Sequence, residues 1–391
     1  MSSTSPTVAF ISGGKLFVAS ASAPPAEVPS AFLQRMLDRI EQDRSRGAWK
    51  DDSFGWNFTA RGPMAKTGAN LGREARFTSV ALAAPGEVLY SLESDAAGGL
   101  FHMQVTSKDE RRMFHKQDVR ISDIAVHPVT GMIALSLRNV DGTSHLGLMN
   151  PTGGGLRPLT EGDVIDGAPS WSPSGGTRGT LLYHSAGIAR APQGHFSAVG
   201  PNAVHELNLD TDELSTLLES ETLDYLTPRK ASDGSLYYIQ RPYYPFGAPP
   251  SRLGILKDII LFPVRLGTAV VHFLNIFSVM FSRKPLITSG GPPREGLDQR
   301  QIMLWGKMMD AEKALRENRG EGGIVPKDWR LIRRDAAGKE TTLSESVVAF
   351  DIAADGGVVW TNGSTIYHQA NGAPRQEIAS GKMIERLTLV L

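Results

Sequence analysis

A unit of roughly 45 residues recurs along this chain, and a period of 40 to 50 residues signals one repeated supersecondary unit. The unit from Ile121 to Asp163 shows the pattern best, because three clusters of turn residues separate four short apolar runs. Within one run Ile133, Leu135 and Leu137 alternate with other residues, which is the period of a β-strand. The sequence therefore predicts an all-β chain made of repeated four-stranded sheets, the architecture of a β-propeller.

Five such units are visible directly, and a sixth follows from the two ends of the chain. The apolar run after Met383 has the pattern of a first strand, and Thr7–Gly13 and Lys15–Ser20 have the pattern of a second and a third. A blade that both ends share would close the structure and remove exposed sheet edges. We expect residues 1–391 to form a single six-bladed β-propeller with its N- and C-termini in one blade. The first strands of the other blades are expected to end near Ala83, His127, Ser172, Lys230 and Ala353.

The segment from Leu156 to Gly176 reads LRPLTEGDVIDGAPSWSPSGG, and the apolar strand LLYHS follows it. This combination resembles the repeat of the TolB-type, WD40-like (PD40 repeat) β-propeller family, and the resemblance is clearest over residues 121–240. It implies a rigid propeller with a central channel, a fold that commonly binds other proteins. One architecture hosts many unrelated tasks, so the resemblance indicates the fold far better than the function.

A first insertion, over residues 23–55, interrupts the first blade. Ser30 follows a proline and precedes apolar residues at helical spacing, so it is expected to cap an amphipathic helix of three to four turns. We expect the helix to pack on the side of the propeller or across a channel mouth, with binding of a partner as the alternative. Its apolar face comprises Phe32, Leu33, Met36, Leu37 and Ile40.

A second and larger insertion, over residues 243–327, lies in the fifth blade. Its most apolar part is a predicted amphipathic helix at about 264–282, which Pro263 separates from a shorter helix before it. A later, more polar helix is predicted to carry Trp305, Met308 and Met309. Candidate residues for binding a partner or a membrane surface are the apolar face and the basic end of the 264–282 helix: Leu266, Val270, Phe273, Leu274, Phe277, Met280, Phe281, Arg283 and Lys284.

The 264–282 helix is not expected to cross a membrane. Its uncharged stretch is short for a bilayer span, and both ends of the insertion must return to strands of one blade. A wide apolar face with basic flanks suits shallow burial in a membrane interface or docking on a partner protein. The third possibility is that the helix packs on the propeller and on the later helix.

No set of residues with the spacing of a known catalytic or metal site is found, and the absence of cysteine excludes thiolate chemistry. The acidic array of Asn208, Asp210, Asp212 and Glu219 has calcium-loop spacing but reads better as a turn between two strands. His127 and His184 are expected near the channel, after a first and a second strand, as ordinary turn histidines. Trp171 and Trp360 are expected to pack inside blades. Neither a cofactor nor a metal is expected.

The charge balance, 41 Lys plus Arg against 41 Asp plus Glu, argues against nucleic acid as a partner. The N-terminus lacks the basic and apolar regions of a secretory signal, so we expect a cytoplasmic protein, with a peripheral position at the inner membrane face as the alternative. The function expected is that of a non-enzymatic scaffold for protein–protein interaction, with a homo-oligomer also possible. The alternative is a hydrolase or lyase with its active site at the channel mouth.

Overall fold

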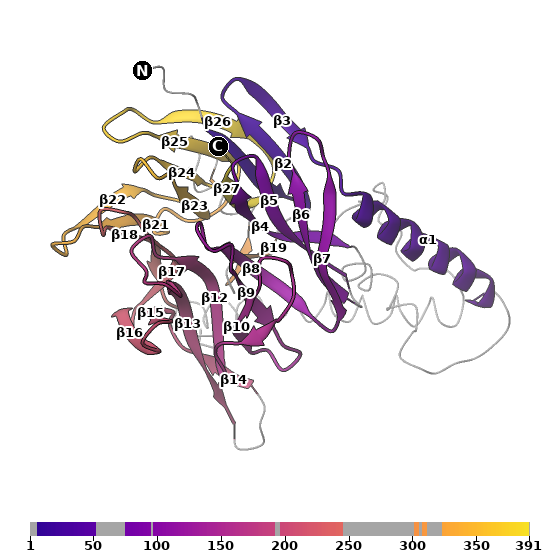
Figure 1. Ribbon diagram of the computed structural model, residues 1–391, viewed down its shortest axis with the longest axis horizontal. Coiled ribbons are helices and arrows are strands. Elements are labelled where there is room, and N and C mark those ends of the chain that lie inside the picture. Colours follow the sequence, from indigo (N-terminus) through magenta and orange to yellow (C-terminus); the bar gives the residue numbers. More distant parts are fainter. Residues whose placement is uncertain are drawn as a thin grey trace, which may run out of the picture. The chain divides into compact units, whose positions relative to one another are not determined.

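The computed structural model describes residues 6–51, 75–94, 97–191, 196–244, 301–304, 307–310 and 323–390. The chain divides into two compact units, Tyr244–Asp298 and the remainder. Every strand named below belongs to that remainder, which is an all-β, propeller-like assembly of antiparallel sheets (Figure 1).

One sheet joins the two ends of the chain. Strand β27 (Ile384–Leu389) pairs antiparallel with β1 (Thr7–Ser12), with Val8 opposite Leu389. The sheet continues through β2 (Lys15–Ser20) to β3 (Ala23–Glu27) at its edge. We call it the terminal sheet.

Three further sheets have four strands each, in sequence order. They are β4 (Arg76–Ala84), β5 (Glu87–Glu93), β6 (Ala97–Gln104) and β7 (Glu110–Gln117); β17 (Leu223–Lys230), β18 (Leu236–Pro242), β21 (Arg330–Arg334) and β22 (Glu340–Ser344); and β23 (Ala349–Ile352), β24 (Val358–Thr361), β25 (Thr365–Gln369) and β26 (Gln376–Ser380).

The last large sheet combines two repeats. Its strands are β8 (Arg120–Val126), β9 (Ile133–Arg138), β10 (Ser144–Met149), β11 (Arg157–Pro158), β12 (Val164–Trp171), β13 (Thr180–Arg190), β14 (Phe196–Val199), β15 (Ala203–Asn208) and β16 (Glu213–Leu218). A single parallel pairing of Ser144 with Ile165 joins the two repeats.

The first strands of the sheets contact one another in a closed cycle. The order is β27, β4, β8, β12, β17 and β23, and β23 contacts β27 again. We call these six the inner strands. Five of them end within one residue of the predicted positions, at Ala84, Val126, Trp171, Lys230 and Ile352.

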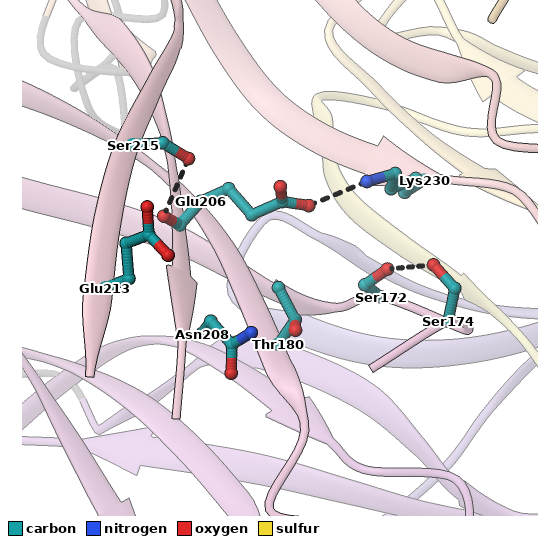
Figure 2. Close-up of a pocket in the computed structure, with 8 residues that line it drawn as sticks. All are labelled: Ser172, Ser174, Thr180, Glu206, Asn208, Glu213, Ser215 and Lys230. Atoms are coloured by element: carbon teal, nitrogen blue, oxygen red, sulfur yellow. Dashed lines mark hydrogen bonds and ion pairs between the residues drawn. The ribbon is translucent and has the colours of Figure 1, made fainter. Parts of the chain in front are cut away.

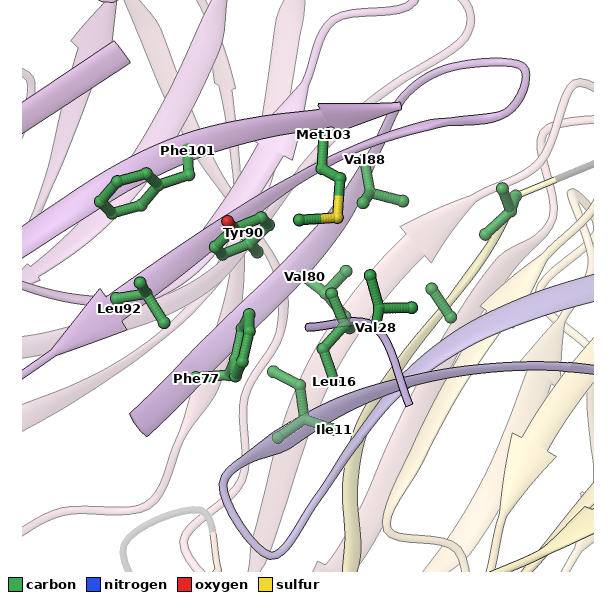
Figure 3. Close-up of a cluster of buried hydrophobic side chains, with 12 residues drawn as sticks. Ile11, Leu16, Val28, Phe77, Val80, Val88, Tyr90, Leu92, Phe101 and Met103 are labelled. Carbon is green, nitrogen blue, oxygen red and sulfur yellow. The ribbon is translucent and has the colours of Figure 1, made fainter. Parts of the chain in front are cut away.

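Alternating apolar side chains of neighbouring sheets form the core between them. Figure 3 shows one such cluster, in which Ile11 and Leu16 of the terminal sheet meet Phe77, Val88 and Tyr90 of the next sheet. Trp171 and Trp360 are also buried in clusters of this kind, as predicted. Burial of aromatic rings contributes most where sheets pack face to face, because each ring removes a large apolar area from water.

The first insertion begins later than predicted. Residues 23–27 form β3, the edge strand of the terminal sheet, although Pro24 and Pro25 lie in it. Proline is tolerated on an edge strand, whose outward groups have no partner strand. Helix α1 (Ala31–Asp51) is also longer than the expected three to four turns, since it contains 21 residues.

The N-terminus of α1 is fixed to β7. Ser30 caps the helix as predicted, because its Oγ accepts a hydrogen bond of 3.0 Å from the Leu33 N–H. Glu110 of β7 accepts a second bond of 3.0 Å from the Phe32 N–H, and it also accepts bonds from the hydroxyls of Ser30 and Tyr90. Phe32 packs against Phe101 with ring centroids 4.6 Å apart. The start of α1 therefore packs on the propeller, in agreement with the preferred expectation.

The second insertion leaves and re-enters one sheet at neighbouring strands. β18 precedes it, β21 follows it, and these strands pair with Gln240 opposite Arg330. The predicted later helix is wrong where the structure describes it, because β19 (Gln301–Leu304) and β20 (Lys307–Asp310) form a hairpin. Leu304 is opposite Lys307 in this hairpin.

Candidate functional site

The inner strands carry a repeated irregularity in their pairing. In β4, β8, β12, β17 and β27 one extra residue lies opposite the neighbouring strand, which is the signature of a β-bulge. Two bulge residues, Ala168 and Thr227, have positive φ angles of 46° and 52°. Bulges often re-aim side chains at functional sites, so the space inside the inner strands is the first candidate site.

Residues of all six inner strands surround a small cavity, which we call the channel cavity. Its volume is about 30 Å³. The polar residues that line it are Ser79, Asp123, Thr227, Arg229 and Arg386.

Ion pairs connect the inner strands around the channel cavity. Arg386 Nη2 of β27 lies 3.4 Å from Asp123 Oδ1 of β8, and Arg229 Nε of β17 lies 3.8 Å from Asp351 Oδ1 of β23. Asp351 Oδ2 accepts hydrogen bonds of 3.0 Å from the Leu389 N–H and 3.1 Å from the Thr388 hydroxyl. These contacts join four of the six inner strands electrostatically.

A buried histidine is bonded to one of the residues that line the channel cavity. His184 is 5% exposed, and its Nδ1 accepts a bond of 3.2 Å from the Thr227 N–H. Burial lowers the pKa of His184 to about 4, while Asp123 and Asp224 raise it and Arg241 and Arg386 lower it further. The imidazole is therefore neutral near pH 7. The structure corrects its predicted position, because His184 lies within β13 rather than after a strand.

Arg241 and Asp224 form a buried ion pair close to that histidine. Arg241 Nε donates to Asp224 Oδ2 at 2.8 Å, and both side chains are nearly inaccessible to solvent. Asp224 Oδ1 also accepts bonds from the N–H and the side-chain amide of Asn202, and the Arg241 guanidinium lies 4.5 Å from the ring of Trp329. The pair is held by complementary groups, as a buried charge requires.

A second, larger hollow lies beside the outer strands of the β12–β16 repeat. This side pocket has a volume of about 250 Å³ (Figure 2). Glu206 of β15 reaches across to Lys230 at the end of β17, with 2.7 Å between Oε1 and Nζ. Ser172 and Ser174 bond to each other at 3.1 Å rather than to a base. The other lining residues are Thr180, Asn208, Glu213 and Ser215, so the pocket suits a small polar group.

The acidic array predicted as a turn is a turn. Asn208 Oδ1 accepts bonds from the backbone N–H groups of Asp210 and Thr211 between β15 and β16, and Asp212 pairs with Arg178 at 3.6 Å. Among the described residues, no group of three or more His, Cys, Asp or Glu side chains could hold a metal ion.

His127 directly follows β8, as predicted. Its Nδ1 accepts bonds of 3.2 Å from the N–H groups of Val129 and Thr130, and its ring packs edge-on against Trp171. These contacts are those of a histidine that orders a turn.

The residues predicted to bind a partner or membrane, in the 264–282 helix and its basic end, lie outside the described residues. Across the part of the chain that is described, no helix is both long enough and apolar enough to traverse a bilayer.

Comparisons with known proteins support the fold. No family model matches the chain, and no curated protein matches it in sequence. A chain in the crystal structure of a nidogen–laminin complex is similar in structure, with a TM-score of 0.51 and 7% identity over 98% of each chain. TolB from Acinetobacter baumannii has a TM-score of 0.50 and 9% identity, over 98% of this chain and 67% of that one. The chain thus has a TolB-type β-propeller fold.

Proposed function

We propose that this protein is a non-enzymatic scaffold, built on a six-bladed β-propeller, that binds a partner protein or a membrane surface through the apolar helix at about 264–282. The observation that carries the proposal is the pairing of β18 with β21, because it anchors both ends of the second insertion on neighbouring strands of one sheet. An insertion anchored at both ends to neighbouring strands can present a recognition element without disturbing the blade that carries it.

The closed cycle of six inner strands supports the number of blades. Each inner strand begins a run of antiparallel strands, and the nine-stranded sheet divides into two such runs at its single parallel pairing. The terminal sheet supplies the sixth blade from both ends of the chain, because β27 pairs with β1.

The size of the channel cavity favours a scaffold over an enzyme. Sites for small organic molecules occupy roughly 300 to 1,000 Å³. The channel cavity, at about 30 Å³, has at most a tenth of that volume. The alternative, a hydrolase or lyase at the channel mouth, has one supporting observation, namely that Asp123, Arg229 and Arg386 converge there. Asp123 and both arginines are engaged in ion pairs, however, and the space beside them does not admit a sugar ring.

The apolar helix supplies the binding element in this proposal. Phe273 and Phe277 belong to its wide apolar face, whereas Thr268 and Asn275 belong to the narrow polar stripe on the other side. Basic residues at both ends, Arg265 and Lys284 among them, would favour an anionic surface such as the inner membrane face.

Paired variants of this helix test the proposal. The double variant Phe273→Glu with Phe277→Glu places two charges on the apolar face, and Thr268→Glu with Asn275→Glu places the same two charges on the polar stripe as a matched control. We expect the native chain to float with anionic vesicles or to cross-link to a partner in cell extracts. The apolar-face variant should lose that association by tenfold or more, and the control should keep it.

Native-like association of the apolar-face variant in both assays would refute the proposal. Analytical ultracentrifugation of the same proteins distinguishes a second copy of the chain from a different partner. Circular dichroism establishes that each variant retains its strands.

A further inference from the structure

The side pocket is built on one face of the sheet in the β12–β16 repeat. The strand register places Thr180 of β13 opposite Asn208 of β15, and Asn208 opposite Glu213 of β16, so the three side chains form one row across that face. Glu206 and Ser215 form the next row, because side chains two residues apart in a strand share a face. All five residues line the pocket (Figure 2).

The same face is apolar where it packs on the neighbouring sheet. Leu182 and Val204 belong to a buried cluster that includes Tyr238 of that sheet. Beyond the cluster the face becomes polar, since Glu206 and Asn208 follow Val204 at alternate positions of β15. A face that only joins two sheets has no use for these polar rows. Their position beside a hollow of about 250 Å³ therefore indicates a binding surface.

Three groups that line the side pocket have hydrogen-bonding capacity that no described residue uses. Thr180 is 8% exposed, and its hydroxyl, which keeps some accessible surface, forms no hydrogen bond. The carboxylate of Glu213 forms neither an ion pair nor a hydrogen bond. Asn208 Oδ1 accepts two backbone N–H bonds, which fixes the orientation of the amide and leaves its NH₂ group as a donor.

The charges around the side pocket disfavour an ion as its ligand. The carboxylates of Glu206 and Glu213 repel an anion, and the ammonium group of Lys230, 2.7 Å from Glu206, repels a cation. All eight lining residues are polar or charged, so an apolar ligand would desolvate them without compensation. The class that fits is a neutral molecule whose groups both donate and accept hydrogen bonds, as hydroxyl groups do.

We propose that the side pocket binds a neutral sugar ring, either a free monosaccharide or the terminal residue of a glycan. Glu213 accepts hydrogen bonds from sugar hydroxyls, the amide of Asn208 donates to them, and the hydroxyl of Thr180 can do either. The volume of about 250 Å³ is slightly below the roughly 300 Å³ at which sites for drug-sized molecules begin, so it suits one ring. This inference goes beyond the scaffold role and does not depend on it.

Saturation-transfer difference NMR on the full chain tests this inference with glucose, galactose, mannose and N-acetylglucosamine. We expect at least one of the four to bind saturably. The uronic acid and the amino sugar of the hexose that binds, measured at pH 6, should bind at least tenfold more weakly, because each adds a charge to the same ring. The methyl glycoside of that sugar identifies the source: equal or tighter binding assigns a glycan terminus, and weaker binding assigns the free sugar.

Four variants make the outcome decisive. Glu213→Ala should weaken binding tenfold or more, whereas Glu221→Ala, at an exposed carboxylate that does not line the side pocket, should bind as the native chain does. Thr180→Val removes one hydroxyl at nearly constant volume and should weaken binding about fivefold, and Thr180→Ser should restore it. If none of the four sugars saturates, if the charged analogues bind equally well, or if Glu213→Ala binds like the native chain, the inference is overturned. Glu213 is exposed, so that variant remains a fair test even if Thr180→Val fails to fold.

Discussion

Acidification should destabilise this protein through His184. The imidazole is buried, and Nδ1 accepts a hydrogen bond from the Thr227 N–H, a role that only the neutral ring can fill. Burial is the main reason that its pKa falls to about 4, against 6.5 for an ordinary histidine.

The sign and size of the effect follow from proton linkage. The unfolded chain binds a proton at this histidine below about pH 6.5, and the folded chain resists doing so until about pH 4. The contribution of the neutral His184 to the free energy of unfolding is therefore fully present above pH 6.5, and it is lost as the pH falls to 4. At 1.36 kcal/mol per pH unit, His184 alone removes about 3 kcal/mol of the free energy of unfolding across that window.

Urea unfolding at a series of pH values from 7.5 to 4 provides the measurement, with His184→Asn as the central variant. The asparagine side-chain oxygen keeps an acceptor for the Thr227 N–H but takes up no proton, so the variant should lose about 3 kcal/mol less than the native chain between pH 6.5 and 4. His145→Gln, at a half-buried histidine in β10, provides a comparison for the loss of a histidine side chain. Parallel curves for the native chain and His184→Asn would refute the reasoning.

Two further variants test contacts described above. Ser30→Ala removes the cap of α1 and should lower the free energy of unfolding by about 1 kcal/mol in urea titration, whereas Ser22→Ala, at an exposed turn, should change it little; equal effects would contradict the capping role. Arg241→Met leaves Asp224 buried without its cation and should lower the free energy of unfolding by about 3 to 5 kcal/mol in the same assay. An unchanged unfolding midpoint would contradict this expectation. The exposed pair of Arg178 supplies the comparison, since Arg178→Met should cost less than about 1 kcal/mol.

The strand framework was predictable because its signal is local. Alternating apolar residues and turn clusters mark each inner strand, and five of the predicted strand ends are correct to within one residue. Local signals failed where a residue type contradicts its context. Pro24 and Pro25 argue against a strand in the sequence, but they lie in β3, where prolines are tolerated because it is an edge strand. Met308 and Met309 have the spacing of a helix face in the sequence, although they lie in one strand of a hairpin.

The channel cavity could not be predicted in this way. Asp123 and Arg386 are far apart in the sequence, and they meet only because β8 and β27 are both inner strands. His184 and Thr227 likewise belong to different repeats. The bulges left one usable signal, the Thr-Pro and Ala-Pro pairs within apolar strands at positions 227–228 and 168–169. A proline inside a strand of this kind indicates a bulge, and in both cases the residue before the proline has a positive φ.

The pairing of β1 with β27 also sets the order of events during biosynthesis. Val8 leaves the ribosome long before its partner Leu389, and at ordinary rates of translation the interval is roughly 20 to 75 s. Until β27 arrives, β1 presents an unpaired strand edge that other nascent chains could join. A chain that terminates before Ile384 never acquires that partner. Closure of the terminal sheet therefore makes the folded state conditional on translation through β27, and products that stop earlier would be the ones left exposed to chaperones and proteases.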